Sequence, residues 1–225
     1  ERITIGASFE GRGLAVLRLG SAPNGMATPT FFLMAGIHGR ELISNEVAAS
    51  FVDRLLTRDG VDPDVTWLLD HHAIYVLITA NPDGHIKNEP GERWAYWRKN
   101  VNPSYGCEGG KFGVDLNRNS SFQWRAPDAW DSPCDETYSG PSAGSEPETA
   151  AIEAFVRTLF PDQRPLDLDA PAPDDATGVF ITLHSYSNLV LWPWGHTYSG
   201  APNEAQLARL GRNLASFNGY TPQQA

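Results

Sequence analysis

The chain has 225 residues, of which 41% are hydrophobic and 20% are charged, and its formal net charge at pH 7 is −10. This apolar fraction is too high for a disordered chain, and the length is sufficient for one large α/β domain with a sizeable core. The acidic balance argues against nucleic-acid binding, which requires a clustered positive field. No apolar run approaches the roughly 18 residues of a membrane-spanning helix. We therefore expect neither nucleic acid nor a membrane as a partner.

Strand-like and helix-like segments alternate in the first eighty residues. The predicted elements are, in chain order, strands at 14–19 and 30–34, a helix at 41–57, a short helix at 64–70 and a strand at 73–79. In the first helix, apolar residues recur every four positions at Ile43, Val47, Phe51 and Leu55, with Ala48, Val52 and Leu56 beside them. Apolar residues at that spacing predict one buried helix face.

The second half of the chain is organised around a long irregular region. Between residues 81 and 144 periodicity is lost and turn residues dominate, and so long a loop in a compact domain is usually functional. Ser145 and Glu148 have the spacing of a helix-starting capping box. The elements predicted after it are a helix from Ser145 with Ile152, Phe155, Val156 and Leu159 on its apolar face, strands at 179–183 and 188–191, and a helix at 203–217. The alternation predicts an α/β fold with a mixed, largely parallel sheet flanked by helices.

Cys107 and Cys134 both lie in the long loop region, in a stretch dense in Gly, Pro, Ser and Asp. A loop this poor in apolar residues has little else to hold it, which favours a disulfide over two unpaired thiols. In the chain-entropy model such a bridge removes about 3.5 kcal/mol of loop entropy from the unfolded state. A disulfide also implies folding in an oxidising space, so we expect a secreted or extracytoplasmic protein.

Two histidines follow predicted buried strands, at the sheet edge where ligands collect in α/β proteins. His38 comes shortly after strand 30–34, and His184 comes directly after strand 179–183. Glu41 lies three residues after His38, so that imidazole and carboxylate can converge on one ion. Catalytic zinc sites use three such nitrogen and oxygen ligands and leave a fourth position open to water.

Each of these residues also has an ordinary structural explanation. An H-x-x-E pair occurs often by chance, a Glu at a helix start commonly complements the helix dipole, and His184 alone could be a buried structural histidine. His71 and His72 lie at a predicted helix-to-strand junction, where hydrogen bonds to nearby backbone are more plausible than metal binding.

Further motifs accompany this pattern in a fixed order. They are Trp97-Arg98-Lys99-Asn100, Asp115-Leu116-Asn117-Arg118-Asn119, the run from Ser132 to Gly140, and His184-Ser185-Tyr186-Ser187. Together with His38-Gly39-Arg40-Glu41, they closely resemble the zinc metallocarboxypeptidases of the carboxypeptidase A/B and carboxypeptidase T type. The resemblance extends from Ile5 to the last predicted helix and therefore covers nearly the whole chain.

The resemblance implies a role for each matching residue. It places the ligands of one zinc ion at His38, Glu41 and His184, and the clamp for the substrate carboxylate at Asn117 and Arg118. Arg98 matches the arginine that polarises the scissile carbonyl and stabilises the oxyanion. The remaining matches are Arg40 and Tyr186 in the peptide subsites and Cys107 with Cys134 as the loop disulfide. Ser120 departs from the family, which usually has an aromatic residue there.

The resemblance also implies that the family's catalytic glutamate, mobile tyrosine and specificity-pocket residue would follow residue 225. We therefore expect residues 1–225 to be a zinc carboxypeptidase catalytic domain shortened at both ends, with no catalytic base in this chain and little activity of its own. We further expect strand 179–183 to have a bare edge, because a family strand pairs there.

The activity implied is that of a metallocarboxypeptidase, a zinc exopeptidase that hydrolyses the last peptide bond and releases a free amino acid. Its partner would be the C-terminus of a peptide or protein, and we expect a monomer. The alternatives are a non-catalytic zinc- or peptide-binding relative and a zinc amidase acting on peptidoglycan stem peptides. Retention of Arg98, Asn117 and Arg118 favours the carboxypeptidase, since neither alternative requires all three.

Overall fold

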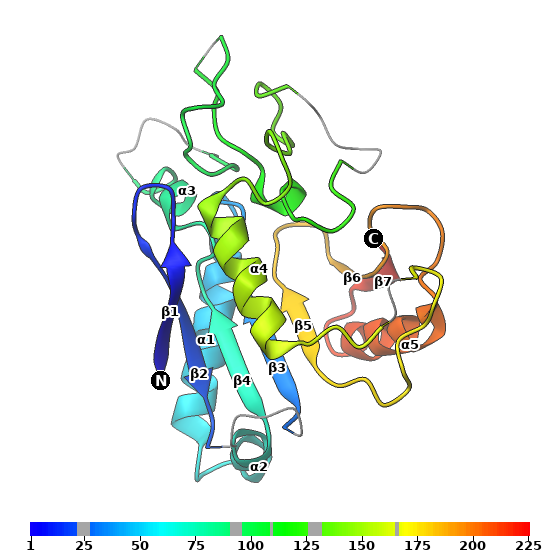
Figure 1. Cartoon of the computed structure of the whole chain (residues 1–225). Helices are drawn as coiled ribbons and strands as arrows, with labels where there is room; N and C mark the ends of the chain where they lie inside the picture. Colours follow the sequence, from blue (N-terminus) through cyan, green and yellow to red (C-terminus); the bar gives the residue numbers. More distant parts are fainter. Residues whose placement is uncertain (22–27, 91–95, 109, 126–131, 165–166) are drawn as a thin grey trace. The chain divides into compact units, whose positions relative to one another are not determined.

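The computed structural model describes residues 1–21, 28–90, 96–108, 110–125, 132–164 and 167–225 (Figure 1). The chain divides into two compact units. The larger contains residues 1–125, 129–160 and 177–185, and the smaller contains residues 126–128, 161–176 and 186–225.

The larger unit is built on a five-stranded sheet with the order β1-β2-β4-β3-β5. Its strands are β1 (Arg2–Ala7), β2 (Gly13–Leu19), β3 (Thr30–Met34), β4 (Ala73–Leu77) and β5 (Val179–Thr182). The β1–β2 and β2–β4 pairs are antiparallel, whereas β3 is parallel to both β4 and β5. The predicted mixed sheet is thereby confirmed. The predicted ligands His38 and His184 follow the carboxyl ends of its parallel strands β3 and β5.

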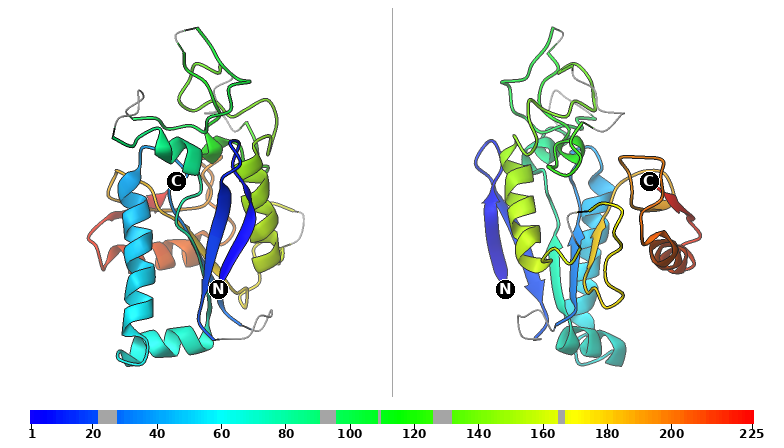
Figure 2. Two further views of the ribbon diagram at one scale, coloured as in Figure 1. Left: turned by 90° about the vertical axis from the view of Figure 1, so that its left-hand side faces the viewer. Right: turned by 45° about the vertical axis from the view of Figure 1, so that its right-hand side comes forward.

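Helices cover both faces of this sheet. They are α1 (Leu42–Arg58), α2 (Pro63–His71), α3 (Pro82–Ile86) and α4 (Pro147–Leu159). Figure 2 shows α1 and α4 on opposite sides of the strands. Successive strand residues point to opposite faces, so β4 serves both layers: Ile74 and Val76 join the core with α1 and α2, whereas Tyr75 and Leu77 join the core with α4.

The buried face of α1 agrees with the predicted one only in part. Ala48, Val52 and Leu55 are buried, but Ile43 and Val47 are 58% and 50% exposed, and the buried face includes Ser44 and Asn45. Ser44 Oγ donates to Glu41 O and accepts from Gly36 N, while Asn45 Nδ2 donates to Ile78 O. These polar side chains are buried because they satisfy backbone groups of neighbouring loops, which apolar spacing does not reveal.

The predicted capping box at α4 is wrong, although the apolar face of that helix is confirmed at Ile152. The N-cap is Glu146, without a side-chain capping bond, and Pro147 is the first helical residue. Ser145 Oγ donates to Glu146 Oε1, and Glu148 Oε1 accepts from Phe9 N. Ser145 is bonded to the adjacent Glu146, and Glu148 is bonded to Phe9, which is distant in sequence, so neither side chain forms the predicted box.

The smaller unit pairs β6 (Leu189–Trp192) in parallel with β7 (Thr221–Gln224), and α5 (Glu204–Ala215) packs against both strands. A Cβ atom at Gly211 would lie 2.6 Å from a ring carbon of Trp192, so glycine permits the close packing of α5 on β6. Strand β7 was not predicted, because Pro222 within it masks the strand pattern. In the described chain, no helix is both long and apolar enough to cross a membrane.

Candidate functional site

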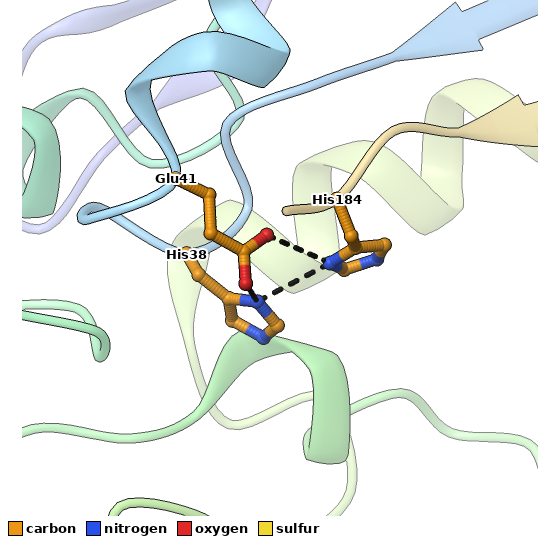
Figure 3. Close-up of side chains that lie close together, drawn as sticks. All are labelled: His38, Glu41 and His184. Carbon is orange, nitrogen blue, oxygen red and sulfur yellow. Dashed lines mark hydrogen bonds and ion pairs between the residues drawn. The ribbon is translucent and has the colours of Figure 1, made fainter. Parts of the chain in front are cut away.

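Three predicted ligands meet at the carboxyl edge of the parallel strands (Figure 3). His38 lies in the loop after β3, Glu41 directly precedes α1, and His184 follows β5. Because β3 and β5 are parallel neighbours, their carboxyl ends lie side by side and bring together residues separated by 146 positions. The loop between β3 and α1 then places Glu41 beside His38.

The three side chains form a compact set of donors for a cation. His38 Nδ1 lies 2.8 Å from Glu41 Oε1, His184 Nδ1 lies 3.0 Å from Glu41 Oε2, and the two Nδ1 atoms are 3.2 Å apart. Nitrogen ligands about 2 Å from a tetrahedral zinc ion are separated by about 3.3 Å. The spacing and the chemistry of the donor set therefore fit zinc.

The charges of this set are strongly coupled. Burial raises the pKa of Glu41, but hydrogen bonds with His184 and His38 outweigh that effect and lower this pKa to about 2. Burial lowers the pKa of His38, but hydrogen bonds to Asp115 and Glu41 outweigh it, so this pKa is raised. The site thus holds a carboxylate that stays ionised at any physiological pH.

Asp115 is a residue of this site to which the sequence had assigned no role. Its carboxylate is fully buried, and Oδ1 lies 3.2 Å from His38 Nε2. A carboxylate behind a metal-binding imidazole fixes the tautomer and raises the basicity of the other ring nitrogen. The only available signal was its position in the Asp115–Asn119 motif, because burial of an acidic residue cannot be read from its neighbours.

Arg98 is brought to the same site, as predicted. Its guanidinium donates to Asp115 Oδ2 from Nε at 3.1 Å and from Nη2 at 2.8 Å, while Nη1 lies 3.9 Å from Glu41 Oε1. Asp115 therefore contacts His38 with one oxygen and Arg98 with the other. One buried carboxylate orients both the ligand and the arginine.

The other predicted substrate residues lie on loops. Asn117 and Arg118 belong to a 3-10 turn (Leu116–Arg118) that Asp115 caps by accepting from Asn117 N at Oδ1, and Arg118 Nη1 donates to Asn117 O. Arg40 is paired with Glu136 at 3.0 Å. Tyr186 begins the smaller unit and is 95% exposed. The subsite roles of Arg40 and Tyr186 remain predictions.

The predicted disulfide between Cys107 and Cys134 is confirmed, with 5.5 Å between the two Cα atoms. Next to it, the buried ammonium of Lys99 donates to Pro133 O at 2.7 Å. Lys99, the residue after Arg98, is thereby attached to the loop that the disulfide closes. His71 and His72 bond to Trp67 O and Leu68 O, which confirms their predicted local role.

Substituting Gly39 by alanine is expected to destabilise the protein by about 3 kcal/mol, an overpacking cost without room for relaxation. An added Cβ would lie 2.2 Å from Gly84 O, a backbone atom, and Gly39 N donates to Arg98 O at 3.0 Å. Denaturant unfolding measures the effect. Gly106→Ala is the control for the loss of a glycine, since Gly106 is not in the left-handed region and an added Cβ would meet only ordinary contacts of 3.7 Å or more. Equal stability of Gly39→Ala and wild type would contradict the backbone contact.

The metal-free protein is expected to lose stability as the pH falls from 4.5, the ordinary pKa of Glu41, toward about 2. The pKa of Glu41 is lowered by folding, so its contribution is complete above the ordinary value and is lost below it as the carboxylate is protonated. Thermal unfolding in chelator across this range measures the loss. Glu41→Gln should flatten the acid limb, and an unchanged limb would refute the assignment.

The comparisons with known proteins agree with this geometry. Residues 1–224 match the protein family described as zinc carboxypeptidase. The chain is 35% identical over 222 residues to carboxypeptidase B of Homo sapiens, covering 97% of this chain and 48% of that protein. It is 34% identical over 208 residues to zinc carboxypeptidase A 1 of Drosophila melanogaster, covering 91% and 43% respectively.

The crystal structure of carboxypeptidase A from Helicoverpa armigera is similar with a TM-score of 0.83 and 26% identity, covering 100% of this chain and 52% of that one. The chain thus spans about half the length of these relatives. Because the family match extends over nearly every residue and includes the His38, Glu41 and His184 cluster, the chain belongs to the zinc carboxypeptidase family.

Proposed function

We propose that the protein is a zinc-dependent exopeptidase that hydrolyses the C-terminal peptide bond of peptides and proteins. The observation that carries this proposal is the convergence of His38, Glu41 and His184 beside Arg98, with Asp115 joining ligand and arginine. Family membership supports the same reaction class. When bound, zinc supplies Lewis-acid polarisation of the carbonyl and lowers the pKa of a water molecule.

The protein's own residues prepare the site for that chemistry. Asp115 accepts from His38 Nε2–H, so that the Nδ1 lone pair would be available to an ion held together with Glu41 and His184. Arg98 carries a fixed positive charge that would stabilise negative charge developing on the scissile carbonyl oxygen. Glu41 and Asp115 are both engaged in these bonds, so we assign the general base to neither.

Selectivity for chain ends is assigned to Asn117 and Arg118. A guanidinium can hold a carboxylate through two parallel hydrogen bonds, and an amide adds a neutral donor. Arg118 lies on the 3-10 turn that Asp115 caps, so the clamp is connected to the metal-binding residues through one carboxylate. We also propose an extracytoplasmic location, which the disulfide supports, since such bridges persist in oxidising compartments.

The experiment that tests the function measures amino-acid release from peptides by the full-length protein. We expect release from free-acid peptides, its loss on zinc chelation, and its recovery when zinc is returned. Arg118→Ala should lower kcat/KM for free-acid peptides by about 10- to 100-fold, the worth of a charge-assisted bidentate contact, and should change cleavage of C-terminally amidated peptides little.

Arg54→Ala is the control for loss of an arginine outside the clamp, since the exposed Arg54 side chain pairs with Asp62. Equal losses for free-acid and amidated peptides in Arg118→Ala would remove the clamp assignment. Absence of amino-acid release by protein fully loaded with zinc would contradict the proposed function and favour a non-catalytic zinc- or peptide-binding protein.

A further inference from the structure

Two loop segments place Arg98 and Asp115 beside His38. Residues 97–100 carry Arg98, and residues 114–118 carry Asp115 and the 3-10 turn. The two oxygens of Asp115 contact different partners, His38 and Arg98. Asp115 can therefore bridge them only if the two segments keep a fixed position relative to each other. Both segments lie outside regular strands, so no sheet ladder fixes that register.

Asn100 joins the two segments. Its backbone N–H donates to Val114 O at 2.9 Å, and its side-chain Oδ1 accepts from Val114 N at 2.8 Å. The side-chain amide thus completes a pair of bonds to the residue directly before Asp115. The backbones are also in contact, since a Cβ at Gly113 would lie 2.1 Å from Asn100 O.

The other end of the Asn100 amide faces two carboxyl groups. Nδ2 donates to Glu146 Oε2 at 2.7 Å and to Glu148 Oε2 at 3.3 Å, and all three side chains are fully buried. Glu146 and Glu148 lie at the start of α4, where negative charge is favoured by the helix dipole. Burial raises the pKa of Glu148.

These carboxyl groups allow the amide only one orientation. Nδ2 must face the carboxylate oxygens as a donor, so Oδ1 must face Val114 N as an acceptor. An aspartate could not replace the amide, because it would place a third oxygen against Glu146 and Glu148. The first turn of α4 therefore sets the position of Val114, and through it that of Asp115.

We propose that Asn100 is a positioning residue, which Glu146 and Glu148 orient so that Asp115 is held between the metal ligand His38 and Arg98. Any effect of Asn100 on catalysis rests on the proposed function, but the effect to be measured is on zinc affinity alone. It predicts that loss of the Asn100 side chain weakens zinc binding although Asn100 contacts no ligand in the described structure.

The test is a double-mutant cycle on zinc affinity, measured by chelator competition in the full-length protein. Loss of a group behind a metal ligand typically costs about 10- to 100-fold in affinity. We expect Asp115→Asn to fall in that range, Asn100→Ala to weaken zinc binding about 10-fold, and the double variant to bind no more weakly than Asp115→Asn. If the loss of zinc affinity in the double variant equalled the product of the two single losses, the proposal would be overturned. Sites without coupling are additive in free energy.

Asn102→Ala is the matched control. Asn102 is also buried and donates to the same Glu146 oxygen at 3.0 Å, but its side-chain amide is otherwise bonded to Ser104 N. It should lower stability without weakening zinc binding. Equal weakening of zinc binding by Asn102→Ala and Asn100→Ala would show that general loosening of the buried network is responsible, and would also overturn the proposal.

Asn100→Thr serves if Asn100→Ala does not fold, because threonine fills more of the space yet cannot reach Val114 N and the carboxyl groups together. Failure of both variants to fold, while Asn102→Ala folds, would make Asn100 a residue of general stability and contradict the assignment. Zinc affinity is read without peptide substrate. An inactive wild type would therefore refute the proposed function while the cycle still decides this inference.

Discussion

In the full-length protein, the replacement of His184 by alanine is expected to abolish the proposed peptidase activity, with a loss of at least about 10³-fold, because zinc supplies several kcal/mol of transition-state stabilisation. Only His38 and Glu41 would remain as ligands. The His184 side chain is 32% exposed, whereas that of His38 is 2% exposed, so its removal leaves a smaller void and should spare folding. Zinc content per chain, measured by elemental analysis, should fall from about one to well below that value.

His71→Ala is the control for this experiment, since His71 is exposed and bonds to Trp67 O of its own helix. It should retain both zinc and activity. If His184→Ala kept a full equivalent of zinc, the proposed ligand set would be wrong. If it lost zinc but not activity, the reaction would not depend on the metal.

The replacement of Arg98 by alanine is expected to lower kcat by about 10²- to 10³-fold, the usual effect of removing one oxyanion donor. KM should change little, because the charge on the carbonyl oxygen develops only in the transition state. The three ligands are untouched, so zinc should be retained. Steady-state kinetics on a free-acid peptide and zinc content measure these two outcomes.

Arg98→Lys separates the charge from its geometry. Lysine keeps a positive charge near Asp115 but cannot donate to Asp115 Oδ2 from two nitrogens, as Arg98 does. We expect its kcat to lie between those of wild type and Arg98→Ala. A loss confined to KM in Arg98→Ala would reassign the residue to ground-state binding, and an unchanged kcat would remove it from the mechanism.

Much of the larger unit could be predicted from hydrophobic pattern. The apolar run at 30–34 and the strand at 73–77 are buried on both faces, so their sequence is nearly continuous in apolar residues. The same pattern was right only in part at α1, where Ala48, Val52 and Leu55 are buried. Ile43 and Val47 have helical spacing, yet Ser44 and Asn45 are buried in their place, since buried polar groups depend on partners that only the tertiary structure brings near.

The sequence by itself determined which residues are candidates for the chemistry and the order in which they occur. His38, Glu41 and His184 could be named as ligands because they follow strands at a sheet edge and match the motifs of one family. Arg98, which lies in the long loop, could be predicted only because it matches a motif of the same family. Whether a residue follows a strand depends only on its neighbours in the sequence, so it can be predicted without knowledge of the fold.

Only the tertiary structure decided how these groups are held. It placed Asp115 between His38 and Arg98, and it buried Asn100 against Glu146 and Glu148. Each of these bonds joins residues at least 17 positions apart, and buried polar side chains are stable only when such partners are present. The candidate ligands can therefore be predicted from the sequence. The roles of the Asp115, Glu146 and Glu148 carboxyl groups and of the Asn100 amide become visible only in the packed structure.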